Sequence, residues 1–194
     1  MTAGLVAVPD EMPEVDLDAA TLHARGLLEA LGVPSDLPGT IDTPRRMAKA
    51  YAALLSAREF DMTSFPNDEG YDELVVVKDI PVQSVCEHHF LPFTGVAHVG
   101  YLPGDRILGL SKFARVVEMF ARRPQVQERL TVQVADWLVA GLAPRGVGVV
   151  IEAEHLCMTL RGVQAAGTTT RTSAVRGLVR DRPHTRAEFL DALQ

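Results

Sequence analysis

Two short stretches, each with a cysteine close to a histidine, constrain the fold of this chain more than any other feature of its sequence. Residues 85–90 read Val-Cys-Glu-His-His-Phe after one apolar run, and residues 154–158 read Glu-His-Leu-Cys-Met after another. Cys86 and Cys157 are the two cysteines of the chain. Thiolate and imidazole are ligands that zinc favours. We therefore expect a fold in which both strand ends meet and bind one metal ion.

A Cys2His ligand set is the first interpretation of these stretches. Cys86 and His89 are three residues apart, so one turn can present both to an ion, and Cys157 would complete a set that leaves a fourth position for water. Such an open zinc site lowers the pKa of bound water to about 7. His88 and His155 would then supply general acid and base groups. The alternatives are a closed structural zinc site with His155 or His88 as fourth ligand, a disulfide, or two inert core thiols.

The composition is that of an ordinary globular protein. The chain has 194 residues, 47% hydrophobic and 23% charged, which suits one domain, or one domain with a small appendage, around a sizeable core. A formal net charge of −6 argues against a general nucleic-acid-binding protein. No apolar run approaches the roughly 18 residues of a membrane span, and we see no signal peptide. We expect a cytoplasmic protein without nucleic-acid or membrane partners.

The spacing of apolar residues predicts helices in the N-terminal part and strands later. We expect a loose tail over residues 1–15 and a loop over 58–70. Helices are expected over residues 17–31, 43–57, 111–123, 125–142 and 185–193. Strands are expected over residues 74–85, 96–101, 107–110, 147–158 and 168–174.

This order of elements predicts an α+β fold. It consists of an antiparallel four-stranded sheet with a helix pair on one face, preceded by N-terminal helices. The sheet edges and the second face need cover, and many chains of this plan join their sheets between subunits.

Basic residues near two helix starts are candidate contacts of an anion, because backbone N–H groups at a helix start attract negative charge. Ser111, Lys112 and Arg115 lie at one such start, although helix capping explains Ser111 equally well. Arg46 lies at another. Arg161 follows Cys157 by four residues and could reach the same pocket. Gln127 and Glu128 are less specific, because composition alone favours a solvated helical face, and His98 is expected to be a buried histidine of the sheet.

Read in order, several motifs closely resemble the GTP cyclohydrolase I family, from about Leu17 to the C-terminus. The motifs are CEHHF at residues 86–90, GYLP at 100–103, GLSK at 109–112, RR at 122–123, QVQERLT at 125–131, HLCM at 155–158 and RGVQ at 161–164, with Asp42-Thr43-Pro44 and Thr172-Ser173. No single motif is decisive, but the ordered set is very specific.

The resemblance implies the tunnelling fold, in which sheets join side by side between subunits into a barrel. Two such rings stack face to face, typically as a homodecamer with sites at subunit interfaces. We expect three segments along the chain: a flexible N-terminal tail (1–15), an N-terminal helical segment (16–70) and a catalytic tunnelling-fold domain (71–194).

The resemblance also implies conversion of GTP and water to 7,8-dihydroneopterin triphosphate and formate, the first step of tetrahydrofolate or pterin synthesis. By motif position, the zinc ligands are Cys86, His89 and Cys157, and the catalytic imidazoles are His88 and His155. Glu128, with Gln127, resembles the anchor of the guanine edge. The residues that resemble ribose and triphosphate contacts are Ser111, Lys112, Arg115 and Arg161, with Arg46 as a further triphosphate contact.

Two departures from the family pattern bear on these expectations. No basic residue lies within residues 165–170, and Arg171 stands where a small or apolar residue is common. Pro124 should sharpen the bend between the paired helices. Two other functions stay open: an NADPH-dependent deazapurine nitrile reductase of the same fold, and a non-catalytic, zinc-stabilised nucleotide-binding oligomer.

Overall fold

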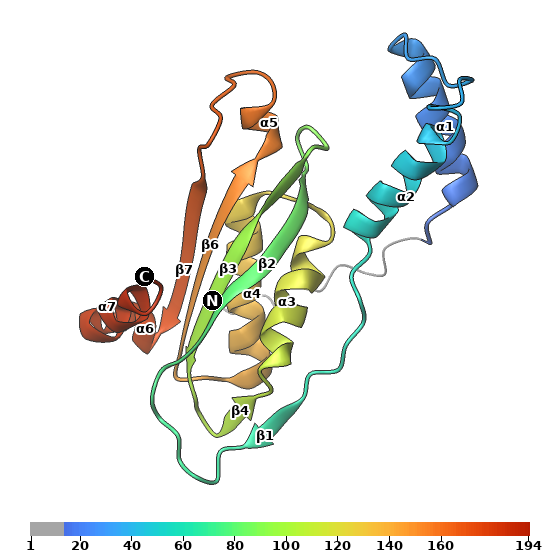
Figure 1. Ribbon diagram of the computed structural model, residues 1–194. Coiled ribbons are helices and arrows are strands. Elements are labelled where there is room, and N and C mark those ends of the chain that lie inside the picture. Colours follow the sequence, from blue (N-terminus) through green and yellow to red (C-terminus); the bar gives the residue numbers. More distant parts are fainter. Residues whose placement is uncertain (1–13) are drawn as a thin grey trace, which may run out of the picture. The chain divides into compact units, whose positions relative to one another are not determined.

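The computed structural model describes residues 14–194 (Figure 1). The tail expected over residues 1–15 lies almost wholly outside the described residues. The described chain divides after Ser56 into two compact units, residues 14–56 and residues 57–194. Within the described residues, every helix is too short or too polar to cross a membrane.

Residues 14–56 form a pair of helices, α1 (Leu17–Ala30) and α2 (Thr43–Leu55). The Asp16 carboxylate caps α1 by accepting from the backbone N–H groups of Asp18 and Ala19. Gly32, with φ of 75°, lies just past the end of α1. Pro44 occupies the first turn of α2, where its missing N–H costs nothing. Both predicted helices are confirmed.

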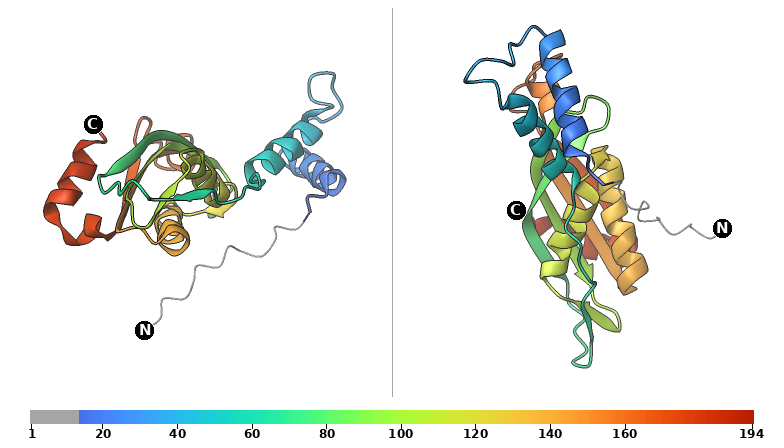
Figure 2. Two further views of the ribbon diagram at one scale, coloured as in Figure 1. Left: turned by 90° about the horizontal axis from the view of Figure 1, so that it is seen from below. Right: turned by 90° about the vertical axis from the view of Figure 1, so that its right-hand side faces the viewer.

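Residues 57–194 are built around a five-stranded mixed sheet that is twisted and curled (Figure 2). Its strands, in spatial order, are β5 (Pro124–Gln125), β2 (Val75–Cys86), β3 (Pro92–Leu102), β6 (Gly146–His155) and β7 (Thr170–Gly177). The long strands pair antiparallel, as predicted, but β5 pairs parallel to the end of β2. The prediction of four antiparallel strands therefore missed the fifth. Pro124 cannot continue a helix, and the extended segment that it starts binds β2 instead, where Gln125 accepts from the N–H of Glu87.

A separate two-stranded sheet joins β1 (Ser64–Pro66) to β4 (Arg106–Leu108). The Arg106 side chain donates to the hydroxyl and the carbonyl of Ser64. The sequence predicted only a loop at β1, because three residues are too few to show a strand period.

Helices α3 (Ser111–Ala121) and α4 (Gln127–Leu142) cover one face of the main sheet (Figure 2). Alternate residues of β3 and β6 point into the core between sheet and helices, among them Phe93, Val99 and Ile151. The predicted helix pair is confirmed. Two more helices, α6 (Leu178–Asp181) and α7 (Pro183–Asp191), bury a smaller cluster that includes Val150 and Phe189.

The strand register brings the two cysteine-containing stretches to the same end of the sheet. Phe93, near the start of β3, pairs with Ser84 of β2 on one side and with His155 of β6 on the other. The turn that links β2 to β3 and the short helix α5 (Leu156–Thr159), which follows β6, consequently lie close together (Figure 1).

Candidate metal centre and active site

Cys86, His89 and Cys157 meet at this end of the sheet. One ligand atom from each lies within 4.8 Å of the other two. The Cys86 Sγ is 3.7 Å from the His89 Nδ1. His88 and His155 are not part of this group. Two sulfur donors and one imidazole are the donor set that zinc favours, and three protein ligands leave one position for water. The residues therefore fit an open zinc site.

Backbone hydrogen bonds and one ion pair fix the turn between β2 and β3. The N–H of Cys86 donates to Leu91 O, and the N–H of Phe90 donates to Cys86 O, each at 2.8 Å. Phe90 adopts a positive φ of 56° to close the turn. The Glu87 carboxylate binds the guanidinium of Arg129 on α4, and this hydrogen bond lowers the pKa of Glu87. Helix α4 therefore anchors the turn that presents two of the metal-competent residues.

Cys157 joins the group from the first turn of α5. Burial and the neighbouring Cys86 thiol raise the pKa of Cys157. Because a metal binds the thiolate form, ion binding and proton release must be coupled here. The Arg161 guanidinium donates to Cys157 O at 3.2 Å, so Arg161 lies beside α5 as the spacing suggested.

His155 is oriented on two sides. Its ring stacks on Phe93, with ring centroids 4.6 Å apart and planes 10° apart. Its Nε2 lies 2.7 Å from the Oε1 of Gln127. Burial lowers the pKa of His155, and the charge of Glu128 opposes that shift. His88, in contrast, is an exposed residue of the turn, with 62% of its side chain accessible.

The two residues expected to bind the guanine edge differ in their surroundings. Glu128 is exposed in the first turn of α4 and acts electrostatically on His155. Gln127 is only 1% exposed, and its amide nitrogen donates within the chain, to Ile151 O and Thr170 O. Contact of Glu128 with a base is therefore sterically open, whereas Gln127 already has partners inside the protein.

The predicted phosphate contacts on α3 start at the opposite end of the sheet. Leu108, three residues before Ser111, donates its N–H to the Tyr101 hydroxyl. Tyr101 lies eight residues along β3 from Phe93, which spans roughly 26 Å at the rise of a strand. Lys112 lies over the ring of Phe60, 5.9 Å from its centroid.

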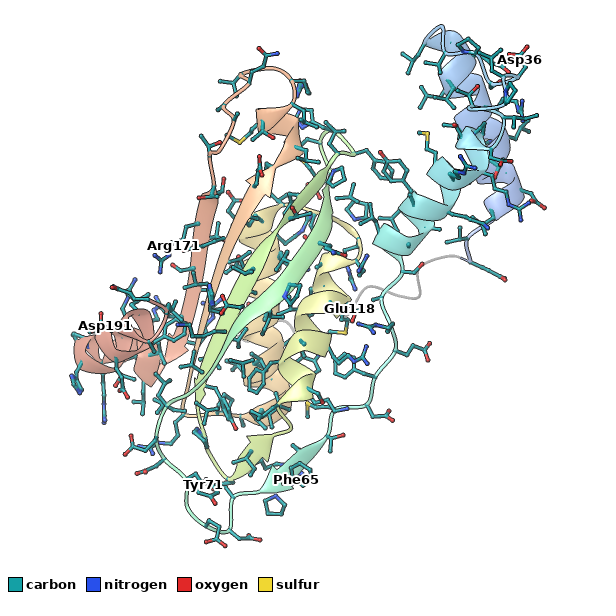
Figure 3. All side chains as sticks on the ribbon, in the orientation of Figure 1. Asp36, Phe65, Tyr71, Glu118, Arg171 and Asp191 are labelled. Atoms are coloured by element: carbon teal, nitrogen blue, oxygen red, sulfur yellow. The ribbon has the colours of Figure 1, made fainter. Side chains whose placement is uncertain are left out.

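The remaining predicted contacts have partners of their own. Arg115 contacts Glu118 at 3.4 Å, and Figure 3 labels Glu118 on α3. Arg46 belongs to the unit of residues 14–56 and pairs with Asp42 at 3.1 Å. Arg171, also labelled in Figure 3, lies on β7 and pairs with Glu152 at 3.3 Å. Within residues 57–194 of one chain, the structure gathers the metal group, His155 and Arg161, but it does not bring the start of α3 to them.

Three contacts of the site were not predicted from sequence: Phe93 on His155, Arg129 on Glu87, and Gln127 on His155. Each joins residues that are at least 28 positions apart in the sequence. Strand register and helix packing decide such contacts, and the residue types alone do not reveal them. His98, expected to be a buried sheet histidine, is confirmed as one: it is 6% exposed and its Nδ1 accepts from the N–H of Asp79.

Fold and site together define a class: an α+β protein with N-terminal helices and an open, zinc-type Cys2His site. The family model of GTP cyclohydrolase I matches residues 20–194. The chain therefore belongs to the GTP cyclohydrolase I family, and GTP cyclohydrolase I is the activity that this membership supports. The metal group is consistent with the zinc site of that family.

Curated relatives match over nearly the whole chain. GTP cyclohydrolase 1 of Mycobacterium tuberculosis (strain ATCC 25618 / H37Rv) is 53% identical over 183 residues, which cover 92% of this chain and 91% of the relative. GTP cyclohydrolase 1 of Mycolicibacterium paratuberculosis is 50% identical over 200 residues, covering 98% of each chain. The solved structure of the archaeosine synthase QueF-Like in the apo form has a TM-score of 0.45 and 22% identity, covering 54% of this chain and 93% of that one. A likeness of that level bears on neither fold nor function.

Proposed function

We propose that this chain hydrolyses GTP at C8 of the purine and rearranges it to 7,8-dihydroneopterin triphosphate, with release of formate. The observation that supports this most directly is the gathering of Cys86, His89 and Cys157 within 4.8 Å in a chain of this family. The product would enter tetrahydrofolate or pterin synthesis. The reaction would take place in the cytoplasm, without nucleic-acid or membrane partners.

Cys86, His89 and Cys157 would bind the zinc ion. When bound, zinc supplies a Lewis acid that lowers the pKa of a coordinated water. His155 lies two residues from Cys157, and its ring is fixed by stacking on Phe93. We assign to His155 the transfer of a proton to the purine as the five-membered ring of the purine opens. We assign to the exposed His88 a second proton transfer, during the rearrangement of the ribose.

Glu128 would select guanine. A carboxylate accepts hydrogen bonds from both N1–H and the exocyclic amine of guanine, whereas adenine lacks the matching donors. An adenine base would leave the Glu128 charge unpaired, which opposes its binding. Gln127 was expected to help at this edge, and that role stays a prediction. Its buried amide has partners inside the protein, Ile151 O and Thr170 O.

The complete site would need more than one chain. Ser111, Lys112 and Arg115 are proposed to bind ribose and triphosphate, with Arg161 and Arg46, yet α3 starts roughly 26 Å along β3 from the metal end. We propose that a neighbouring subunit supplies the three residues of α3, whereas Arg161 comes from the same chain as the metal end. The sheets would join edge to edge into the barrel of a tunnelling fold, two rings forming a homodecamer with interfacial sites. The proposed segments are a tail (1–15), a helical segment (16–70) and a catalytic domain (71–194).

One assay tests the reaction. Purified protein is incubated with GTP, dihydroneopterin triphosphate is followed by fluorescence after oxidation, and formate is measured in parallel. We expect both products to appear together, to disappear with a chelator and to return with added zinc, while ATP gives neither. Absence of both products with zinc present, or full turnover without zinc, would contradict the proposal. Nothing among the described residues favours the nitrile reductase or the non-catalytic oligomer over this reaction.

A further inference from the structure

The backbone around Gln127 fixes the orientation of its side-chain amide. The amide nitrogen lies 3.0 Å from Ile151 O and 2.9 Å from Thr170 O. A backbone carbonyl only accepts hydrogen bonds, so the amide atom that faces both must be the nitrogen. Half a turn of the amide would place its oxygen against two carbonyl oxygens. Because Gln127 is 1% exposed, bulk water cannot relieve that repulsion.

Two threonine hydroxyls reinforce the same orientation. The Thr131 hydroxyl donates to Gln127 O at 2.8 Å, which uses its one hydrogen. In its 2.6 Å contact with the Thr172 hydroxyl, Thr131 must therefore accept, and Thr172 must donate. The Thr172 oxygen then presents a lone pair to the Gln127 amide nitrogen at 3.1 Å. It shares the two amide hydrogens with the two backbone carbonyls. Every hydrogen bond in this group has a fixed direction.

The fixed amide determines which nitrogen of His155 bears hydrogen. The Gln127 Oε1 faces the His155 Nε2 at 2.7 Å, and an amide oxygen can only accept. We propose that Gln127 is a positioning residue, which keeps neutral His155 in its Nε2–H tautomer, so that Nδ1 is the ring nitrogen that takes up the proton released by the attacking water and passes it to the nucleotide. Stacking on Phe93 fixes the plane of the ring, and Gln127 fixes its tautomer. The tautomer follows from the hydrogen bonds, while its use in proton exchange rests on the proposed function.

The tautomer is measurable without any turnover. In as-purified protein labelled with 15N-histidine, at a pH well above the ordinary imidazole pKa, we expect a pyrrole-type nitrogen shift at Nε2 of His155 and a pyridine-type shift at Nδ1. The His155 signals are assigned by their loss in His155→Asn. A pyrrole-type shift at Nδ1 in the wild type overturns the inference. Only the assignment uses a variant, and the shifts themselves are those of the wild-type protein.

Gln125 offers a matched control, because it is also a glutamine at 1% exposure and its amide also donates to a backbone carbonyl, that of Phe120. Gln125→Met should leave the His155 nitrogen shifts as in the wild type. Gln127→Met should give averaged shifts from two exchanging tautomers. A single Nε2–H tautomer in Gln127→Met would overturn the inference, since Gln127 would then not determine it.

Kinetics separate positioning from direct binding of the base. Loss of the hydrogen-bond partner of a metal-ligating histidine typically costs roughly 10- to 100-fold in metal affinity or activity, and we expect a loss of the same order for the partner of His155. We expect that loss in the kcat of Gln127→Met, with KM for GTP nearly unchanged. A rise in KM at unchanged kcat would instead make Gln127 a contact of the guanine and overturn the positioning role. If the wild type fails to turn over GTP but shows the Nε2–H tautomer, the proposed function fails while the tautomer assignment stands.

Discussion

Cys157 is the residue on which closure of the metal group depends. It is the only member that comes from the β6–α5 side of the sheet, whereas Cys86 and His89 share one turn. Removing Cys157 leaves two ligands from a single turn, and catalytic zinc sites use three protein ligands. Substitution of Cys157 should therefore disrupt metal binding, although the Cys157 side chain is only partly buried.

We expect Cys157→Ser to lose zinc and formate release together, since a serine hydroxyl does not replace a thiolate as a zinc ligand. Zinc is measured by inductively coupled plasma mass spectrometry on the purified protein, and formate by a coupled enzymatic assay. Met158→Leu changes the exposed neighbouring residue and should keep both zinc and activity. A Cys157→Ser protein that is free of zinc but fully active would refute the assignment.

The ion pair of Glu118 with Arg58 leads to a prediction about how folding stability depends on pH. Arg58 donates to both oxygens of its carboxylate, the shortest contact being 2.7 Å, and this hydrogen bond lowers the pKa of Glu118 from its ordinary value of 4.5. A carboxyl with a lowered folded-state pKa stabilises the protein above its unfolded pKa, and this contribution is lost as the pH falls through the folded value. Because Arg58 is exposed, the effect should be small.

Glu118→Gln should therefore reduce the difference in folding stability between about pH 6 and about pH 3. Urea midpoints of wild type and variant at both values measure it. Glu69→Gln removes a carboxylate from an exposed loop and serves as the control. An identical pH dependence in wild type and Glu118→Gln would show that the pair with Arg58 does not contribute.

At the scale of elements, helix α7 depends on two glycines of the sheet. The ring of Phe189 packs where side chains are missing at Gly100 and Gly148. A Cβ at Gly148 would lie 2.5 Å from the ring, and one at Gly100 would lie 2.7 Å from it. Both distances are too short for any real contact, so the ring would have to move. Gly100 and Gly148 thus leave the space into which the Phe189 ring of α7 packs.

Gly148→Ala should destabilise the protein by about 1–3 kcal/mol, the usual cost of overpacking a core. Adding Phe189→Leu in the same chain should restore part of the loss, because a smaller side chain leaves room for the new methyl group. Thermal unfolding measures both. Gly26→Ala, in the interior of α1 with no atom within 4 Å of the new Cβ, should instead stabilise by up to about 1 kcal/mol. A Gly148→Ala protein as stable as the wild type would contradict this account of α7.

The elements that could be predicted from sequence are those with a repeating pattern. In strand β6 the residues of the main core recur at every second position from Val147 to Ala153. Helix α3 has Phe113, Val116 and Val117 at helical spacing. Strands β1 and β5 have three and two residues, too few for any pattern. They form because neighbouring backbone groups, at β4 and at the end of β2, are available to pair with them.

The candidate site divides in the same way. The metal group could be predicted because thiol and imidazole near two strand ends point to one chemistry. The environment of Gln127 could not. The composition of its helix favoured a solvated face, yet Gln127 is buried while Glu128 beside it is exposed. Its partners Ile151 and Thr170 are 24 and 43 residues away. The pairing of β6 with β7 and the packing of α4 on both strands bring these two carbonyl groups to Gln127.

At the scale of the whole molecule, the distance between the start of α3 and the metal end predicts that two subunits contribute to each active site. His155 and Cys157 are two residues apart, so one chain supplies both of them to a given metal end. Arg115, on α3, would serve the site of a neighbouring subunit. Arg115→Ala and His155→Ala should therefore each be inactive alone and complement one another when both chains are in one oligomer.

Random assembly of equal amounts of these two chains gives about a quarter of the sites both an intact α3 and an intact His155, so we expect about a quarter of wild-type activity per site. Co-expression with two different affinity tags and purification on both isolates the mixed oligomers. The control pairs Cys157→Ser with His155→Ala. Every metal end then has one defect or the other, and no activity should return. No activity in the mixed Arg115→Ala and His155→Ala oligomers would show that a single chain supplies the whole site. Activity in the control would show that the metal end itself is divided between chains.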